Sequence, residues 1–233
     1  MKFDPPLISA TLLKRYKRFL ADVRFDDGTE TTAHCANPGS MMGLAEPGSM
    51  VWLSKSDNPK RKLAWSWELV DDGTSLVGVH TGKANALVEG AINAGHIPEL
   101  TGYKSLRREV KYGENSRIDL LLEDPARPTT YVEVKSVTLS RTKGLAEFPD
   151  SKTARGAKHM AELAEMAKQG HRAVVFFLVQ RSDCKSMQPA ADIDPKYAES
   201  LATALTAGVE VLCYSCRLTP DEITLDHRLE VAI

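Results

Sequence analysis

The chain has 233 residues, 42% of them hydrophobic, which is enough to build one large domain or two small ones with a real core. Its 30 Lys and Arg residues nearly balance 31 Asp and Glu residues, so no overall charge attracts a polyanion and any nucleic-acid surface must come from local clustering. Four scattered cysteines exclude a disulfide framework. The N-terminus lacks the apolar run of a signal peptide, and no stretch is long and apolar enough for a membrane span, so we expect a cytoplasmic protein.

Residues 7–80 carry short strands separated by turns. Asp-Gly steps at 26–28 and 71–73 stand between alternating apolar runs, and this is a strong hairpin signal. About five short strands predict a small closed barrel, with the OB fold as the natural candidate. We therefore place a first domain at residues 1–82.

In residues 83–233, helical spacing of apolar residues appears between the strand-like segments. A helix is predicted over 84–95, followed by three strands in SLRREVKY, SRIDLLLE and TYVEVKSVTL. A second helix runs to about residue 169, RAVVFFLVQ forms a strand covered on both faces, Asp194-Pro195 starts a third helix, and VEVLCYS is a strand. The second domain thus has the order helix, three strands, helix, strand, helix, strand.

The second and third of these strands carry the most informative charges. Asp119 lies on one strand, and Glu133 and Lys135 project from the same face of the next, because side chains alternate along a strand. Two acids and an amine in this arrangement can hold a divalent cation next to a water-activating group. A solvated face with alternating Glu and Lys is the plainer interpretation of the same spacing.

That strand order, with an acid on the second strand and Glu-x-Lys on the third, resembles the PD-(D/E)xK nuclease superfamily. The resemblance implies an αβββαβ core in which Asp119 and Glu133 bind Mg²⁺ and Lys135 positions and polarises the attacking water. The residue before Asp119 is Ile118 where the superfamily motif has proline.

A wider resemblance covers nearly the whole chain. The segments LLKRYKRFLADV, HCANPGSMMGL, RREVKYGENSRIDLLL, YVEVKSVTL, EFPDSKTARGAKH and DIDPKYAESL are similar to those of the sugar fermentation stimulation protein A (SfsA) family. It implies an α+β fold with an N-terminal OB-fold-like β-barrel, followed by a PD-(D/E)xK nuclease-like αβββαβ domain with a mixed sheet. It also implies DNA binding of low sequence specificity and a link to sugar metabolism. A helix-turn-helix proposed for the family near the C-terminus conflicts with the strand predicted at VEVLCYS.

Two further acids are candidates for the catalytic site. Glu89 lies on the first helix of the second domain, where nucleases of this class often add a carboxylate, and Glu109 lies on the first strand. A solvated helix face and a charge ladder with Arg107 and Lys111 are the respective alternatives.

Basic residues predict where nucleic acid binds. The run Lys14, Arg15, Tyr16, Lys17 and Arg18 combines cations with an aromatic ring that can stack on a base. Arg155 and Lys158 share a face of the second helix, and Arg141 and Lys143 lie in the loop before it. His159, beside Lys158, is placed to assist a phosphate, and a partly buried structural histidine is the alternative that we favour.

These patterns lead to one main hypothesis and one rival. The first is a DNA-binding protein, acting on single-stranded or structured DNA, that hydrolyses phosphodiesters with Mg²⁺ or Mn²⁺ held by Asp119 and Glu133. The rival is a non-catalytic DNA-binding regulator of sugar metabolism with a degenerate nuclease fold.

Overall fold

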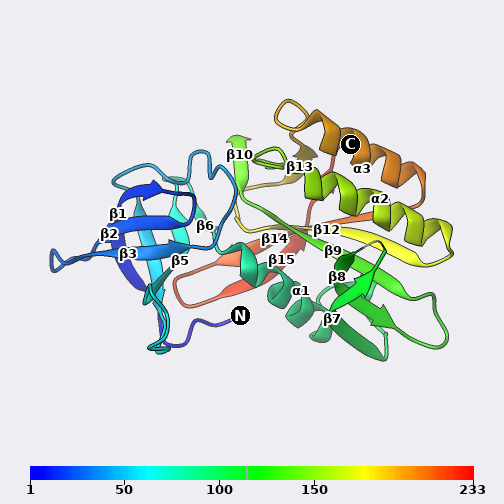
Figure 1. The fold of residues 1–233 in the computed structure, drawn as a ribbon, viewed down its shortest axis with the longest axis horizontal. Helices are drawn as coiled ribbons and strands as arrows, with labels where there is room; N and C mark the ends of the chain where they lie inside the picture. The colour runs from blue at the N-terminus through cyan, green and yellow to red at the C-terminus, as the bar shows by residue number, and fades with distance from the viewer. Residues whose placement is uncertain (114) are drawn as a thin grey trace.

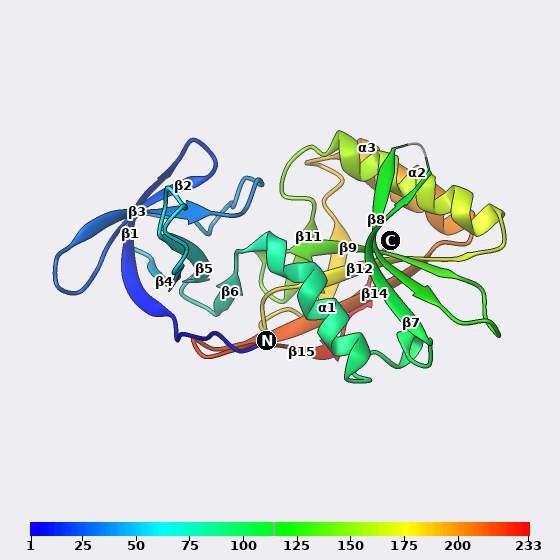
Figure 2. The ribbon, with the colours of Figure 1, turned by 60° about the horizontal axis from the view of Figure 1, so that its bottom comes forward.

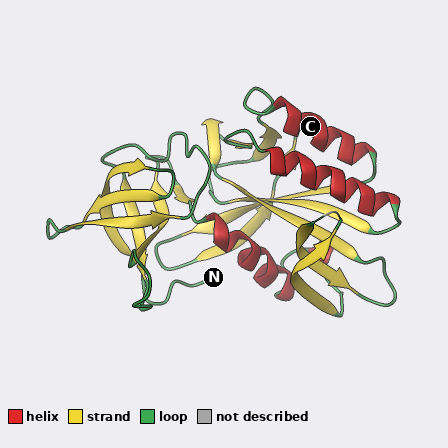
Figure 3. Ribbon diagram, in the orientation of Figure 1, coloured by secondary structure: helices red, strands yellow, loops and turns green. Residues whose placement is uncertain are grey.

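The computed structural model describes residues 1–113 and 115–233, which form two side-by-side parts joined near residue 80 (Figure 1). The first part contains only strands, and the second combines strands with the three α-helices (Figure 3). The strands of the first part are β1 (Ile8–Tyr16), β2 (Leu20–Arg24), β3 (Glu30–Cys35), β4 (Met50–Lys55), β5 (Trp65–Asp71) and β6 (Leu76–Gly78).

The strands β1 to β5 close into the predicted barrel. The hydrogen-bonded order is β3-β2-β1-β4-β5, and a parallel β3–β5 pairing completes the ring. The expected Asp-Gly turns are present, and Asp72 Oδ1 accepts hydrogen bonds from the backbone N–H groups of Thr74 and Ser75. Trp67 is fully buried in the barrel core, while Trp65 is half-buried.

The second part is built on a mixed six-stranded sheet in the order β15-β14-β12-β9-β8-β7. Strands β9, β12 and β14 are parallel to one another, whereas β7, β8 and β15 run antiparallel to their neighbours. Its elements are η1 (Thr81–Lys83), α1 (Ala84–Asn93), η2 (Pro98–Leu100), β7 (Ser105–Tyr112), β8 (Ser116–Glu123), β9 (Thr130–Val137), α2 (Ala154–Lys168), β12 (Arg172–Val179), α3 (Pro195–Thr206), β14 (Glu210–Leu218) and β15 (Ile223–Arg228).

The order α1, three strands, α2, β12, α3, β14 confirms the expected αβββαβ core. Strand β14 covers all of VEVLCYS except Val209, so this segment is a strand and not part of a helix-turn-helix. The helix starts follow from their caps, since the Thr153 hydroxyl accepts from Gly156 N and Asp194 Oδ1 accepts from Tyr197 N.

The sequence patterns did not reveal a smaller four-stranded sheet beside the main one. It has the order β10-β11-β13-β16 and consists of β10 (Leu139–Thr142), β11 (Leu145–Phe148), β13 (Ser186–Pro189) and β16 (Glu230–Val231). These strands have four residues or fewer, too short for an alternating pattern to stand out.

The main sheet separates two apolar cores. Helix α1 covers one face, while α2 and α3 lie side by side on the other (Figures 1 and 2). The first three residues return to the second part of the molecule, where Phe3 N donates to Asp221 O at 2.8 Å and Phe3 joins the α1-side core. The N-terminal segment therefore fastens the barrel to the sheet.

Candidate metal and nucleic-acid site

The site begins where β8 and β9 separate. On β8, the residues paired with β9 extend from Leu122 to Leu120. Asp119 is the next residue of β8, at the fork where the two strands diverge. Asp119 Oδ2 accepts a hydrogen bond from Val134 N at 2.8 Å, so a side chain takes the place of a backbone partner. Asn85 of α1 donates to Asp119 Oδ1 at 2.8 Å. The acid is thereby held at the fork by two donors.

Glu133, on β9, is buried with 2% of its surface exposed. Its Oε1 accepts from Lys135 Nζ at 2.7 Å and forms a short hydrogen bond with His159 Nδ1 of α2. Its Oε2 is also buried, and no hydrogen-bond partner for it exists among the described residues. A buried carboxylate oxygen without a partner is costly, so this atom is available to a ligand.

The pKa values of the two acids are shifted in opposite directions. Burial, followed by the negative charge of Glu133, raises the pKa of Asp119 to about 6. Burial also opposes ionisation of Glu133, but hydrogen bonds and charge from His159 and Lys135 outweigh it and lower that pKa below its usual value. A cation between the carboxylates would remove the cost that Asp119 bears.

A divalent cation fits this recess with few protein ligands. The part of the chain that the structure describes contains no cluster of three His, Cys, Asp or Glu side chains arranged to hold a metal. Mg²⁺, however, is commonly bound by one or two carboxylates with water and substrate phosphate completing its shell. Asp119 and the free Oε2 of Glu133 supply such a pair.

Glu109 lies in the same row of the sheet as Asp119. On β7, Arg108 pairs with Leu120 and Val110 with Ile118, so Glu109 stands opposite Asp119. Its φ of 53° is a left-handed conformation that is uncommon for glutamate and typical of strained functional positions. Asn85 Nδ2 also lies 3.4 Å from Glu109 Oε1, which brings this predicted residue to the edge of the recess.

Glu89 lies farther along α1 and has a different partner. Its carboxylate is 3.4 Å from the Arg108 guanidinium, on the exposed side of β7. The structure gives it no contact with Asp119 or Glu133 among the described interactions. Of the five predicted catalytic residues, Asp119, Glu133 and Lys135 are brought together, Glu109 borders them, and Glu89 is outside.

His159 has a contact that the sequence patterns did not reveal. It was expected to be a partly buried structural histidine, and it is 5% exposed and contacts Glu133 directly. Arg155 Nε donates to His159 Nε2 at 3.2 Å. Because Nε2 is the acceptor, the ring proton is on Nδ1, which donates a hydrogen bond to Glu133. Its distance of 26 residues from Glu133 in the chain left no local sequence signal for the contact.

Three more side chains around Glu133 have buried oxygens without hydrogen-bond partners among the described residues. They are both carboxylate oxygens of Glu162 on α2, the hydroxyl of Tyr112 on β7 and the hydroxyl of Tyr197 on α3. Lys158 lies 3.5 Å from Glu162 Oε1. Sequence reasoning missed Glu162 because an acid on an amphipathic helix is usually solvated.

The cations predicted on α2 border a hollow next to the recess. Arg155 and Lys158 line it together with Arg117 of β8, which was not singled out in the sequence. Glu109 and His159 form the wall toward the acids, and the hollow has a volume of about 370 Å³. Three cations therefore face the approach to the acidic recess.

The basic run of the barrel divides into bound and unbound side chains. Arg15 donates to the carbonyls of Asn37, Gly39 and Ser40 and holds the loop after β3. Lys14 and Tyr16 both contact Asp22, at 3.4 and 3.1 Å. The remaining two, Lys17 and Arg18, form the β1–β2 turn, and no described residue forms an ion pair with either.

The predicted loop cations also differ from each other. Arg141 is bound on two sides, to Glu147 at 2.7 Å and to Asp192 at 2.6 Å, which leaves little of its guanidinium for a phosphate. Lys143 is exposed in the β10–β11 turn.

None of the helices within the described ranges is long and apolar enough to cross a membrane.

Comparison with known proteins gives matches over both parts of the chain. Residues 13–79 match the SfsA N-terminal OB domain, and residues 82–222 match the sugar fermentation stimulation protein RE domain. Sugar fermentation stimulation protein homologs of Paramagnetospirillum magneticum and Rhodospirillum centenum are 60% and 59% identical over 97% and 100% of this chain, and these matches cover 95% and 100% of the relatives.

A solved structure has the same overall fold. The structure of Pyrococcus furiosus SfsA in complex with Ca²⁺ superimposes with a TM-score of 0.91 at 29% identity. The match covers 100% of this chain and 98% of that one. The arrangement of the barrel and the mixed sheet is therefore shared along the whole length.

Proposed function

This chain belongs to the sugar fermentation stimulation protein (SfsA) family, and from that premise and the acidic recess we propose that it binds DNA and hydrolyses a phosphodiester with a divalent cation. Asp119 and Glu133 hold the cation, which is Mg²⁺ or Mn²⁺ in this proposal. The Ca²⁺ complex of the Pyrococcus furiosus relative supports a divalent ion as the ligand class.

The buried, unpartnered Oε2 of Glu133 is the observation that carries this proposal. The other oxygen of the same carboxylate already has two donors, so the side chain is fixed with one lone-pair face turned away from the protein donors. Together with the raised pKa of Asp119, this is the electrostatic signature of a site that binds positive charge.

Each residue of the site has a separate task. When bound, the cation supplies charge stabilisation at the phosphoryl oxygens and a more acidic water. Asp119 is oriented by Asn85 and Val134 N, and Glu133 is oriented by His159. Lys135 carries a positive charge at the edge of the recess, where it orients a water and stabilises negative charge on the phosphate.

Local cations support DNA as the substrate, since the net charge of −1 provides no general attraction. Arg117, Arg155 and Lys158 line the hollow beside Glu109 and His159, and phosphates of the backbone bind there in this proposal. Such contacts position the strand without reading its sequence, which agrees with low sequence specificity.

The test is cleavage by the purified protein of labelled single-stranded, duplex and branched DNA with Mg²⁺, Mn²⁺ or EDTA. We expect cleavage with either metal and at least a roughly 10³-fold loss in Glu133→Gln, which keeps the shape but removes the charge. Glu123→Gln is the matched control, because Glu123 is paired with Arg107 at the exposed edge of the same sheet. Absence of cleavage on every substrate with both metals contradicts the enzymatic part of the proposal.

One observation favours the rival function, a non-catalytic DNA-binding regulator. The ion pair between Lys135 and Glu133 partly neutralises the acid that would otherwise bind metal. In that case DNA binding remains salt-sensitive but is the same in Glu133→Gln and in the wild type, and no substrate is cut. Binding assays with and without metal therefore separate the two functions.

A further inference from the structure

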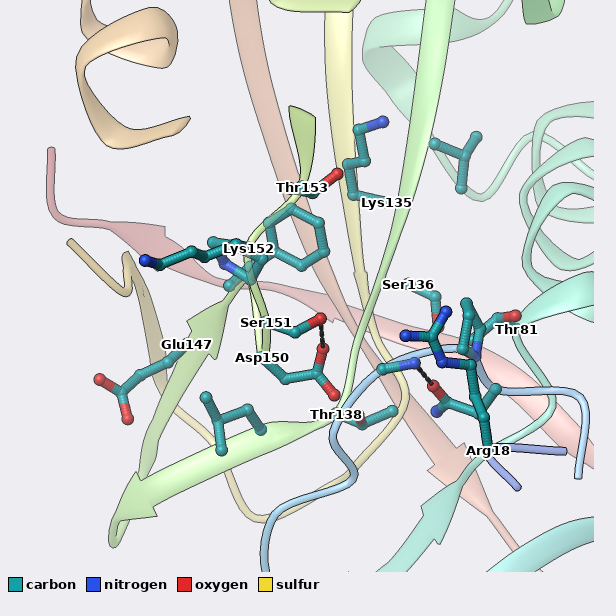
Figure 4. A pocket seen from close by; sticks show the side chains of 17 residues that line it. Arg18, Thr81, Lys135, Ser136, Thr138, Glu147, Asp150, Ser151, Lys152 and Thr153 are labelled. Atoms are coloured by element: carbon teal, nitrogen blue, oxygen red, sulfur yellow. Dashed lines mark hydrogen bonds between the residues drawn. The ribbon is translucent and has the colours of Figure 1, made fainter. Parts of the chain in front are cut away.

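A second hollow lies between the barrel and the sheet (Figure 4). It has a volume of about 350 Å³ and combines Arg18 and the loop after β3 with the β9 residues Val134, Lys135 and Ser136. Segment 147–153 forms the remaining side. The hollow thus starts at Lys135, next to the proposed metal site, and extends toward the barrel.

The carboxylates around this hollow are already engaged. Asp150 Oδ2 accepts from Met41 N at 3.0 Å, and its Oδ1 accepts from the Ser151 hydroxyl. Glu147 is bound by Arg141. Asp150 also approaches Gly39 so closely that a Cβ there would lie 2.2 Å from its Oδ2, which ties the barrel loop to the second domain.

Arg18 is the cation of this hollow that remains available. Its side chain extends from the barrel toward Ser136 (Figure 4), and within the described residues no carboxylate pairs with it. Lys152 extends in a different direction, away from Arg18 (Figure 4). Hydroxyl groups of Ser136 and Thr138 add neutral donors to the wall, whereas the Thr81 hydroxyl already donates to Ala36 O.

The turn that presents Arg18 is strained. Lys17 and Arg18 have φ values of 46° and 65°, a region that favours glycine and costs each of them about 1 kcal/mol or more. The next residue, Phe19, is 42% exposed and stacks against His34 at a centroid distance of 6.4 Å. A strained turn thus displays a free cation and an exposed aromatic ring in adjacent positions.

We propose that this hollow and turn form a subsite for single-stranded DNA, in which Arg18 binds a backbone phosphate and Phe19 stacks on a base. The inference rests on the proposed function, because the strand leads from this subsite to Lys135 and the acidic recess. Cations and exposed aromatic rings together are the usual means by which OB-type barrels hold single strands.

The dimensions of the hollow favour an unpaired strand. About 350 Å³ accommodates a ligand of the size of one nucleotide, whereas a double helix cannot enter a space of that size. Lys14 Nζ lies over the ring of Tyr16, which the sequence favoured as the stacking ring, at 5.2 Å from its centroid, and the Tyr16 hydroxyl donates to Asp22. Phe19 takes over the stacking role in this arrangement.

The test measures binding of a short fluorescein-labelled oligothymidylate by fluorescence anisotropy in EDTA, so that neither metal nor cleavage contributes. Phe19→Ala is expected to weaken binding by about 5- to 150-fold, the range for one base stack. Arg18→Ala is expected to weaken binding and to reduce the salt slope by about 0.7, the value for one phosphate contact on a single strand. Phe19→Trp retains affinity.

Matched controls come from the same barrel. Met50→Ala removes an apolar side chain with 53% exposure, and Lys60→Ala removes an exposed cation; both are expected to bind like the wild type. Wild-type affinity in Phe19→Ala and Arg18→Ala overturns the subsite, as does an equal loss for a blunt hairpin duplex. Loss of binding in these variants without cleavage by the wild type removes the nuclease and leaves the subsite standing.

Discussion

Two groups of buried polar and charged side chains in this molecule differ in how completely their atoms are paired. We call the fully paired group the complete cluster and the other the incomplete cluster. Arg181, 3% exposed, binds Asp72 and Asp183 at 2.7 Å each and also donates to Thr138 O, so its charge is matched on every side. Around Glu133, by contrast, oxygens of Glu133, Glu162 and Tyr112 are buried without hydrogen-bond partners among the described residues. The complete cluster joins the two domains, and the incomplete one has the properties of a ligand site.

The largest effect is expected from breaking the complete cluster. Arg181→Met leaves two carboxylates without their partner, and such a loss costs about 3–5 kcal/mol, or a fall in Tm of about 6–20 °C. Thermal unfolding followed by circular dichroism measures it, with Lys185→Met as an exposed control. A Tm change as small as that of the control would show that the Arg181 cluster does not hold the domains together.

A smaller effect is expected from removing His159, which orients Glu133. His159→Ala should weaken Ca²⁺ binding by about 10- to 100-fold, the range for a residue that orients a metal ligand. His159→Asn, which keeps a donor near the Nδ1 position, should recover most of the affinity. Isothermal titration calorimetry measures both, and exposed His96→Ala serves as the control. Equal affinity in His159→Ala and the wild type contradicts the orienting role.

Arg15 and Arg18 allow the same comparison on the barrel. Arg15 donates to four backbone carbonyls, whereas Arg18 is left unpaired by the described residues. Arg15→Ala should therefore lower the free energy of unfolding by about 1–3 kcal/mol, and Arg18→Ala should leave it nearly unchanged. Urea denaturation distinguishes them. A larger loss of stability in Arg18→Ala than in Arg15→Ala would contradict the structural role of Arg15.

The smallest effect concerns pH. The pKa of Asp119 is raised from 3.8 to about 6 in the folded, metal-free protein, so its ionised form costs stability as pH rises through 6. A cation needs that ionised form. The increase in Tm on adding Ca²⁺ should therefore be full at pH 8 and decline below about pH 6. An increase that stays constant down to pH 5 would exclude Asp119 as a ligand.

Periodicity and the family resemblance predicted most of the fold, because the barrel strands alternate and β12 is apolar throughout. Asp119, Glu133 and Lys135 were found from their spacing on adjacent strands. His159 and Glu162 were not found in this way. Helix α2 and strand β9 are separate in the sequence, and a sequence pattern does not show which of their residues come into contact. The basic run 14–18 likewise did not reveal that Arg15 holds a loop while Arg18 faces a hollow.

The central claim is that Asp119 and Glu133 bind a divalent cation. The most direct measurement is the anomalous difference density of a crystal soaked in Mn²⁺. A peak within ligand distance of Asp119 and of Glu133 Oε2, next to the Val134 main chain, is the result that this account predicts. An empty recess at saturating Mn²⁺, with Lys135 still bound to Glu133, would contradict it.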